Sequence, residues 1–253
     1  MKIEVSPIFE ALINTAVENF IGLANQSIAK RGRFSVALSG GSTPEPLYRA
    51  LAQPANQQRV VWEQVHLFWG DERPVPPDHA ESNYHMVQEA LIAHVPVPEG
   101  NVHRVPAEMD VRMAAFSYEE TLRDFFKGEQ PRFDLVLLGM GDDGHTASLF
   151  PHSAGLNEAQ RWFIANFVPT HQTWRLTLTR SAINAARRVW VLVRGGSKAD
   201  KLAEVLAGPY DPQTNPIQLI APEMGELIWM VDETAAQQLP AELLVRQNPG
   251  HNE

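Results

Sequence analysis

A repeated order of buried strand, polar loop and helix restricts the fold of this chain more than any other feature of its sequence. Apolar runs at residues 36–38, 65–69, 134–138 and 189–193 each lead into a loop rich in Gly or charged residues, and residues 226–239 read as strand then helix. Continuous apolar strands are typical of a mostly parallel sheet that is covered on both faces. The pattern therefore predicts a Rossmann-like α/β fold with helices on both faces of a central sheet.

Local signals place the helices around these strands. Residues 8–31 carry apolar side chains at spacings of three and four, which predicts an amphipathic helix before the first glycine loop. A second helix is expected to start near Thr43 with Pro44 in its first turn, and a third to be capped by Ser82. Residues 161–179 carry two strand-like segments in direct succession, which predicts a small antiparallel hairpin.

Length and composition favour one large core. The chain has 253 residues, of which 44% are hydrophobic and 20% charged, and it contains no internal repeat or clear linker. We therefore expect residues 1–253 to form a single α/β domain. The chain has no Cys, which excludes disulfides, thiolate metal sites and cysteine nucleophiles.

The charge balance limits the class of ligand. Thirty Asp and Glu against 21 Lys and Arg give a net charge of −9, so we expect no nucleic-acid partner and any anionic ligand must be held by local donors. No run approaches the roughly 18 apolar residues of a membrane span, and the first 20 residues lack a secretory signal pattern. We expect a cytoplasmic protein without a membrane partner. The sequence does not fix its oligomeric state, for which a monomer or weak dimer is the expectation.

Residues Ser39 to Thr43 form a glycine-containing loop between a buried strand and a helix start. Free backbone N–H groups and the positive end of the helix dipole favour an anion at such a place. The alternative is a turn whose glycines only permit positive φ, with Thr43 as an ordinary cap. The loop matches neither the GxSxG nucleophile motif nor a nucleotide P-loop. We predict that Gly40, Gly41, Ser42 and Thr43 bind a phosphate group.

Residues 139–144 match GxGxxG after a strand, but a dinucleotide site is not favoured there. Two Asp inside the loop would repel a pyrophosphate, and Pro151 leaves little room for the long helix that should follow. The loop instead offers His145 at a strand end, with carboxylates two and three residues away. An imidazole can accept a proton near neutral pH, and a carboxylate can fix its tautomer. A histidine satisfied inside the core is the alternative.

Charged residues follow two further strands. Asp71, Glu72 and Arg73 end one of them, so their side chains should reach the same rim, where Arg73 could bind phosphate in a bidentate manner or pair within the triplet. Lys198 follows a Gly-Gly-Ser turn at a helix start, where solvation alone is the simpler interpretation. His145 and His152 lack metal-ligand spacing and there is no HExxH, so no metal site is expected.

Four segments, in order and spacing, resemble the 6-phosphogluconolactonase family: LSGGSTPEPLY, DERPVPPDHAESNY, FDLVLLGMGDDGHTASLFP and GGSKADKL. The resemblance spans roughly residues 34–232. SGGSTP is shared with the related glucosamine-6-phosphate deaminases, whereas DERxVP with SNY, and GDDGHTASLFP, are the discriminating motifs. Arg175 matches the family's RxTLT strand, although His171 to Trp174 stand where lactonases often have paired prolines.

The resemblance implies the NagB/RpiA/CoA transferase-like fold and hydrolysis of 6-phospho-D-glucono-1,5-lactone without a metal or organic cofactor. A δ-lactone is an activated ester, so one positioned base can suffice, and such a base contributes about 10²- to 10⁴-fold. His145 is then the base, with Asp143 orienting it or contacting the sugar, and amides of the glycine loop stabilise the oxyanion. The implied substrate and phosphate contacts are Gly40, Gly41, Ser42, Thr43, Asp71, Arg73, Asn83, Gly144, Arg175 and Lys198.

Two alternative functions remain open at this point. A deaminase or isomerase on the same fold normally has a Glu shortly after the loop His and DEY in place of Asp71-Glu72-Arg73, and this chain has neither. A sugar-phosphate-binding module of a transcription regulator normally has a helix-turn-helix segment before the fold, and only some thirty residues precede the first loop here. Both features favour the lactonase.

Overall fold

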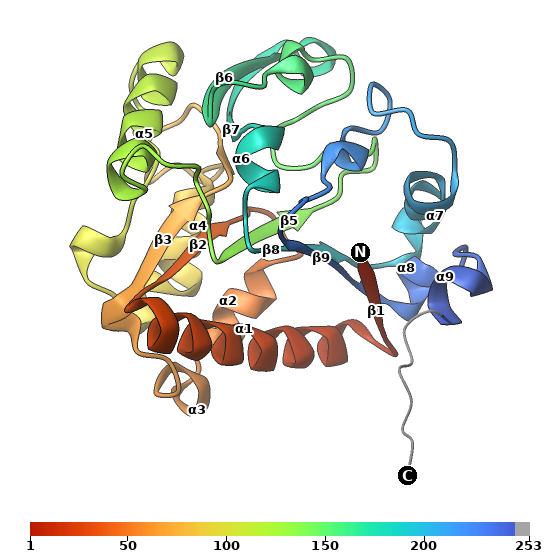
Figure 1. Cartoon of the computed structure of the whole chain (residues 1–253), viewed down its shortest axis with the longest axis horizontal. Coiled ribbons are helices and arrows are strands. Elements are labelled where there is room, and N and C mark those ends of the chain that lie inside the picture. Colours follow the sequence, from red (N-terminus) through yellow and green to blue (C-terminus); the bar gives the residue numbers. More distant parts are fainter. Residues whose placement is uncertain (246–253) are drawn as a thin grey trace.

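A central sheet of six parallel strands organises the computed structural model, which describes residues 1–245 (Figure 1). The strand order is β1-β9-β8-β5-β2-β3. These strands are β1 (Lys2–Ser6), β2 (Phe34–Leu38), β3 (Val65–Trp69), β5 (Leu135–Gly139), β8 (Arg188–Val193) and β9 (Glu226–Asp232). The mostly parallel sheet predicted from the apolar runs is confirmed.

Helices cover both faces of this sheet. Figure 1 shows α1 and α2 below the sheet and α5 and α6 above it. The helices are α1 (Phe9–Arg31), α2 (Glu45–Leu51), α3 (Pro54–Gln57), α4 (Asn83–Ala90), α5 (Val111–Phe125), α6 (Arg180–Asn184), α7 (Ala199–Ala207), α8 (Glu233–Ala236) and α9 (Ala241–Val245). Two short 3₁₀ turns matter for the site, namely η5 (Pro169–His171) and η6 (Gly196–Lys198).

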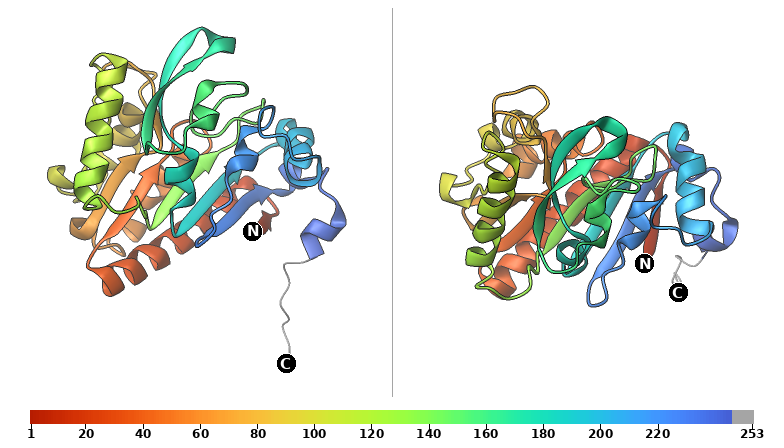
Figure 2. Two further views of the ribbon diagram at one scale, coloured as in Figure 1. Left: turned by 45° about the horizontal axis from the view of Figure 1, so that its top comes forward. Right: turned by 90° about the horizontal axis from the view of Figure 1, so that it is seen from above.

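A second, antiparallel sheet lies beside the central one (Figure 2). Its order is β4-β7-β6, with β4 (Asp71–Glu72), β7 (Thr173–Leu178) and β6 (Phe163–Val168). The predicted hairpin is β6 and β7, and β4 extends it to three strands. Gly70 joins the two sheets, because its N–H donates to the Leu38 carbonyl (2.8 Å) and its carbonyl accepts from the Leu178 N–H (2.8 Å).

Most of the buried apolar residues form one cluster, whose members range from Ile3 to Leu239. The strands supply most of it, since β2 is buried at all five positions and Trp69 and Trp190 are fully enclosed. Each fully buried large side chain contributes about 1.5–3 kcal/mol relative to exposure. This shared core supports the proposal of a single domain, of which residues 246–253 lie outside the described part.

The helices start and end where their capping residues indicate, except for one helix that starts two residues later than expected. The α1 helix ends at Gly32, whose φ of 73° is left-handed and whose N–H donates to the Ile28 carbonyl. Ser82 caps α4 by accepting from the His85 N–H, as predicted. The helix expected from Thr43 begins instead at Glu45, with Pro44 as its N-cap.

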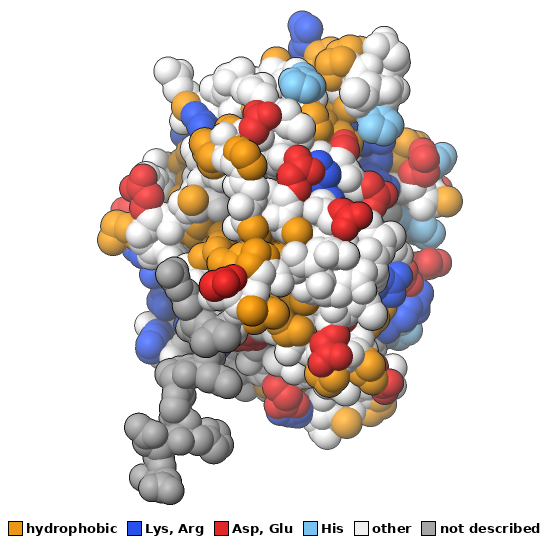
Figure 3. All heavy atoms as spheres, turned by 90° about the vertical axis from the view of Figure 1, so that its right-hand side faces the viewer, with side chains coloured by type: hydrophobic (Ala, Val, Ile, Leu, Met, Phe, Trp, Pro, Cys, Tyr) orange, Lys and Arg blue, Asp and Glu red, His pale blue; other side chains and the backbone are white. Residues whose placement is uncertain are grey.

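The surface mixes side-chain types. Figure 3 shows hydrophobic side chains gathered near the middle of the face that carries α7, with acidic side chains spread across it. Among residues 1–245, none of the helices combines the length and apolar character that crossing a bilayer requires.

Candidate active site

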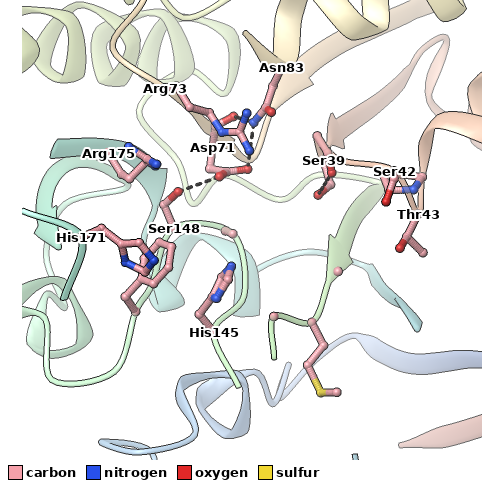
Figure 4. A pocket seen from close by; sticks show the side chains of 18 of the residues that line it. Ser39, Ser42, Thr43, Asp71, Arg73, Asn83, His145, Ser148, His171 and Arg175 are labelled. Carbon is pink, nitrogen blue, oxygen red and sulfur yellow. Dashed lines mark hydrogen bonds between the residues drawn. The ribbon is translucent and has the colours of Figure 1, made fainter. Parts of the chain in front are cut away.

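A cavity of about 370 Å³ opens where β2, β3 and β5 end (Figure 4). This edge is where ligands bind in parallel α/β sheets, because the loops after the strands converge there. Most of the residues predicted for the site line it: Gly40, Gly41, Ser42, Thr43, Asp71, Arg73, Asn83, His145, Arg175 and Lys198. Below, we call it the site cavity. Asp143 and Gly144 do not line it.

The loop from Ser39 to Thr43, called the Ser-Gly loop below, offers backbone donors to the cavity. Within the described part of the chain, the amides of Gly40 to Thr43 donate no hydrogen bond to another protein group, whereas the Ser39 N–H donates to the Tyr48 hydroxyl (3.1 Å). Gly41 has a φ of 93°, which a side chain would strain. A Cβ on Gly40 would lie 1.8 Å from Oδ1 of Asn83, so the loop packs directly on α4. The loop is thus held in place while its N–H groups stay available to an anion.

Two guanidinium groups add positive charge to the same cavity. Figure 4 shows Arg73, which follows β4, near Arg175, which lies on β7. Arg73 donates to the Glu81 carbonyl (2.5 Å) and Arg175 to the Trp174 carbonyl (3.0 Å); among residues 1–245 neither forms an ion pair with a carboxylate. Burial, and then the charge of Arg73, lower the pKa of Arg175. An anion placed between them would relieve this repulsion.

Lys198 reaches the cavity from η6 and pairs with a carboxylate of the loop after β5. Its Nζ lies 2.6 Å from Oδ1 of Asp142, a carboxylate that is 83% exposed. Such an exposed pair contributes little to stability. It places the ammonium beside the loop that carries His145, so Lys198 is a third cation of the site cavity.

His145 and Asp143 form a hydrogen-bonded pair on the loop after β5. The Nδ1 atom of His145 lies 2.5 Å from Oδ1 of Asp143, and the His145 N–H donates to the same oxygen (3.1 Å). The imidazole stacks on Phe150, with ring centroids 4.1 Å apart. With Nδ1 engaged by the carboxylate, Nε2 is the nitrogen left to exchange a proton in the cavity.

The pKa of Asp143 is set by opposing effects. Burial disfavours its ionised form, but the hydrogen bond and charge of His145 outweigh burial and lower the pKa of Asp143 to about 2. Asp143 therefore stays ionised at neutral pH. An ionised carboxylate on Nδ1 holds the orientation of the ring.

The glycines of this loop have structural tasks of their own. Gly144, at a φ of 80°, donates to the Gly141 carbonyl (3.2 Å), and Gly141 donates to the His145 carbonyl (2.9 Å). Both N–H groups are therefore engaged inside the turn. The structure does not bring Gly144 to the site cavity, so the loop amides expected to stabilise an oxyanion do not include these two.

The Asp71-Glu72-Arg73 triplet divides its side chains between two sides. The Asp71 carboxylate faces the cavity and accepts from the Ser148 hydroxyl (2.7 Å), with the Asn83 side-chain amide at 3.3 Å (Figure 4). Glu72 is buried on the other side, and among residues 1–245 the triplet contains no ion pair between its own side chains. The rim position expected for all three side chains is therefore wrong for Glu72.

Glu72 organises the start of α4. Its carboxylate accepts from the backbone N–H groups of Asn83 (2.7 Å), Tyr84 (2.8 Å) and Arg73 (2.8 Å), and from the Ser82 hydroxyl (3.1 Å). Burial raises the pKa of Glu72 despite these hydrogen bonds. The contacts fix α4, and with it Asn83, against the strand that carries Asp71.

Several lining residues were not predicted as site residues: Ser39, Met140, Ala147, Ser148, Phe150 and His171. Ser148 and Phe150 lie in the HTASLFP run after His145, and their contacts with Asp71 and His145 are the reason they line the cavity. His171 comes from η5, and its ring lies 5.3 Å from that of Phe150. Among the described residues, no cluster of three or more His, Asp or Glu is suited to hold a metal ion.

The pair of His145 and Asp143 should contribute to stability in a pH-dependent way. Because the pKa of Asp143 falls from 3.8 to about 2 on folding, its contribution is present above 3.8 and is lost as pH falls toward 2. Urea unfolding should therefore show Asp143→Asn as less stable than the wild type near pH 6, with a difference that shrinks steadily below about pH 4.

Asp142→Asn is the matched control on the same loop, since its exposed carboxylate should contribute little to stability at any pH. A difference between wild type and Asp143→Asn that does not change with pH would show that the carboxylate does not stabilise the folded chain through its charge.

The parallel sheet, the Ser-Gly loop with its available N–H groups and the His–Asp pair are typical of α/β proteins that act on phosphorylated small molecules. Within that class, the chain belongs to the family described as glucosamine-6-phosphate isomerases/6-phosphogluconolactonase, whose model matches residues 8–229.

Individual relatives of this chain within the family are 6-phosphogluconolactonases. The chain is 44% identical to a 6-phosphogluconolactonase of Synechocystis sp. over 91% of this chain and 95% of that protein. It is 38% identical to a 6-phosphogluconolactonase of Mycobacterium tuberculosis over 95% of this chain and 99% of that protein. The solved structure of 6-phosphogluconolactonase from Trypanosoma cruzi superposes with a TM-score of 0.81 at 31% identity, covering 94% of this chain and 96% of that chain.

Proposed function

We propose that this chain hydrolyses 6-phospho-D-glucono-1,5-lactone to 6-phospho-D-gluconate, a step of the oxidative pentose phosphate pathway. The observation that carries the proposal is that one cavity holds an imidazole hydrogen-bonded to a carboxylate, a loop of available N–H groups and three cations. The relatives named above support the same reaction. The deaminase alternative is not favoured.

The phosphate group is held by local donors. The amides of Gly40, Gly41, Ser42 and Thr43 bind its oxygens, and Arg73 and Lys198 supply charge-assisted contacts. Arg175, which repels Arg73 when the cavity holds no anion, gains from the same negative charge. This local concentration of donors explains how a chain of net charge −9 binds a dianionic substrate.

Water attack follows from the position of His145. The Nε2 atom takes a proton from a water molecule, whose oxygen then forms a bond to the lactone carbonyl carbon and gives a tetrahedral oxyanion. Collapse of this intermediate breaks the bond between that carbon and the ring oxygen, which receives the proton back from His145. The product is an open-chain acid that loses its carboxyl proton to solvent. Asp143 holds the ring and stabilises its protonated form during the reaction.

In this proposal, Asp71 and Asn83 form hydrogen bonds with the sugar part of the substrate. Their polar atoms face the cavity from a buried position, and Ser148 holds the Asp71 carboxylate in one orientation. A fixed acceptor of this kind suits sugar hydroxyls. Asn83 also braces the Ser-Gly loop through its contact at Gly40. A cytoplasmic location and a monomeric or weakly dimeric state stay predictions.

Lactone consumption with and without the protein tests the proposal, because these lactones also hydrolyse spontaneously. We expect the protein to accelerate hydrolysis of the phosphorylated lactone far more than hydrolysis of unphosphorylated gluconolactone.

Arg73→Ala should raise the KM for the phosphorylated lactone by about tenfold or more with a small change in kcat, since it removes a charge-assisted contact to the phosphate. Ammonia release from glucosamine 6-phosphate without lactone turnover would overturn the proposal, and an unchanged KM would remove Arg73 from phosphate binding.

A further inference from the structure

A concentration of cationic side chains lies at the edge of the central sheet opposite the site cavity. They come from the end of α1 and from the residues at or just before the starts of β5 and β8. The residues are Lys30, Arg31, Arg132, Arg187 and Arg188, and they line a surface cavity of about 400 Å³, which we call the basic cavity. Cations that lie this close together repel one another unless a negative group compensates them.

One carboxylate accounts for part of this charge. Asp134 is buried, lies 2.6 Å from Nη2 of Arg31 and 3.4 Å from Nε of Arg187, and also accepts from the Ser35 N–H (2.9 Å). Glu226 forms an ion pair with Arg188, with Oε2 of Glu226 3.1 Å from Nε of Arg188. Within the described part of the chain, the ion pairs at the basic cavity thus use two carboxylates for five cations.

Among the residues that the structure describes, the remaining positive charge is not paired with carboxylates. Among residues 1–245, neither Lys30 nor Arg132 forms an ion pair, and Arg132 donates only to the Met224 carbonyl (3.3 Å). Burial, and then the charges of Arg31 and Arg132, lower the pKa of Arg187, and its Nε is buried without a hydrogen bond. The guanidinium groups repel one another across the cavity, and a bound anion would relieve that repulsion.

We propose that the basic cavity binds a small molecule that carries a diphosphate or triphosphate group. Arginine suits this chemistry because its planar guanidinium binds phosphate oxygens in a bidentate manner. A phosphate monoester carries about −1.5 to −2 charges at neutral pH, so three uncompensated cations match a longer phosphate chain better than a single phosphate. The site differs from the site cavity in its location, at the amino ends of the strands, and in its residues.

Inorganic pyrophosphate is the probe that tests this site, with binding measured by isothermal titration calorimetry on the full chain in the presence of saturating 6-phosphogluconate, which occupies the site cavity. The double variant Lys30→Ser/Arg132→Ser removes two cations that do not hold the buried Asp134. We expect its affinity for pyrophosphate to fall by about tenfold or more. The matched control is Arg59→Ser/Arg104→Ser, which removes two cations paired with Glu18 and Glu108 elsewhere on the surface, and its affinity should stay unchanged.

Two further arms separate this site from the site cavity and from a macromolecular partner. Arg73→Ala should leave pyrophosphate binding at the basic cavity intact, so loss of all binding in that variant would overturn the proposal. Equal affinity for pyrophosphate in the two double variants would also overturn the proposal. So would a protein that binds poly-glutamate but does not bind pyrophosphate. Melting temperatures of both double variants should match within a few degrees, which excludes unfolding as the cause of lost binding.

Discussion

His145→Ala should abolish most lactone hydrolysis while leaving binding of a phosphorylated ligand largely intact. The variant removes the group that accepts the proton from water but leaves the Ser-Gly loop, Arg73 and Lys198 in place. A positioned general base contributes about 10²- to 10⁴-fold, so kcat should fall by about that factor with a smaller change in the affinity for 6-phosphogluconate. The measurement is initial rate of lactone consumption after subtraction of the spontaneous reaction.

His171→Ala is the matched control for this prediction. Its imidazole lines the same cavity and contacts Phe150, but within the described residues it is bonded to Thr170 and to no carboxylate. The loss of activity in His171→Ala should be small in comparison. If His145→Ala turned over at a near-normal rate while His171→Ala did not, the base would have been assigned to the wrong histidine.

Gly141→Ala should reduce turnover strongly by displacing His145 without removing it. A Cβ at position 141 would lie 2.1 Å from Nδ1 and 2.2 Å from Cε1 of His145, and 2.8 Å from Oδ1 of Asp143. The φ of Gly141 is not in the left-handed region, so the backbone itself would accept Ala. The imidazole must move, and a displacement of about 1 Å at a catalytic group can cost about 10²-fold in rate.

Gly22→Ala separates this local effect from the general effect of adding a methyl group. Gly22 lies in α1, where a Cβ would meet no atom within 4 Å, and Ala should stabilise the helix by about 1 kcal/mol without changing turnover. Circular dichroism would check that both variants fold. Full activity in folded Gly141→Ala would mean that the position of His145 after β5 is not what catalysis requires.

Most of the central sheet was predictable because its strands are buried on both faces. The expected strand at 65–69 agrees with β3 residue for residue, and the other apolar runs fall within one or two residues of β2, β5 and β8. The first strand was missed because Lys2 and Glu4 interrupt its short apolar pattern at the edge of the sheet. β4 is two residues long, and only its pairing with β7 defines it.

The missed helix α5 is a different case, because its signal was present. Its buried residues Ala114, Ala115, Tyr118, Glu119 and Leu122 recur at helical spacing after an Asp110 cap. An acidic residue among them, Glu119, interrupts the apolar stripe. It is buried because it accepts from the Trp162 N–H and pairs with Arg123.

The candidate site was predictable where residues follow a strand directly. The ends of β2 and β5 place the Ser-Gly loop and His145 together without further information. The division of Asp71 and Glu72 also follows from the alternation of side chains along a strand, which places neighbours on opposite faces. His171 could not be inferred in this way, because it lies between the two strands of the hairpin in the second sheet, which bring it to the cavity.

The position of Gly70 limits how the site cavity can deform. The walls of the cavity belong to two sheets, with the Ser-Gly loop on one and Arg175 on the other. Gly70 is hydrogen-bonded to Leu38 in the first and to Leu178 in the second. If the sheets separated to admit a bulkier sugar, at least one of these two bonds would have to break. Two backbone hydrogen bonds, and not the lining side chains alone, thus oppose a widening of the site cavity.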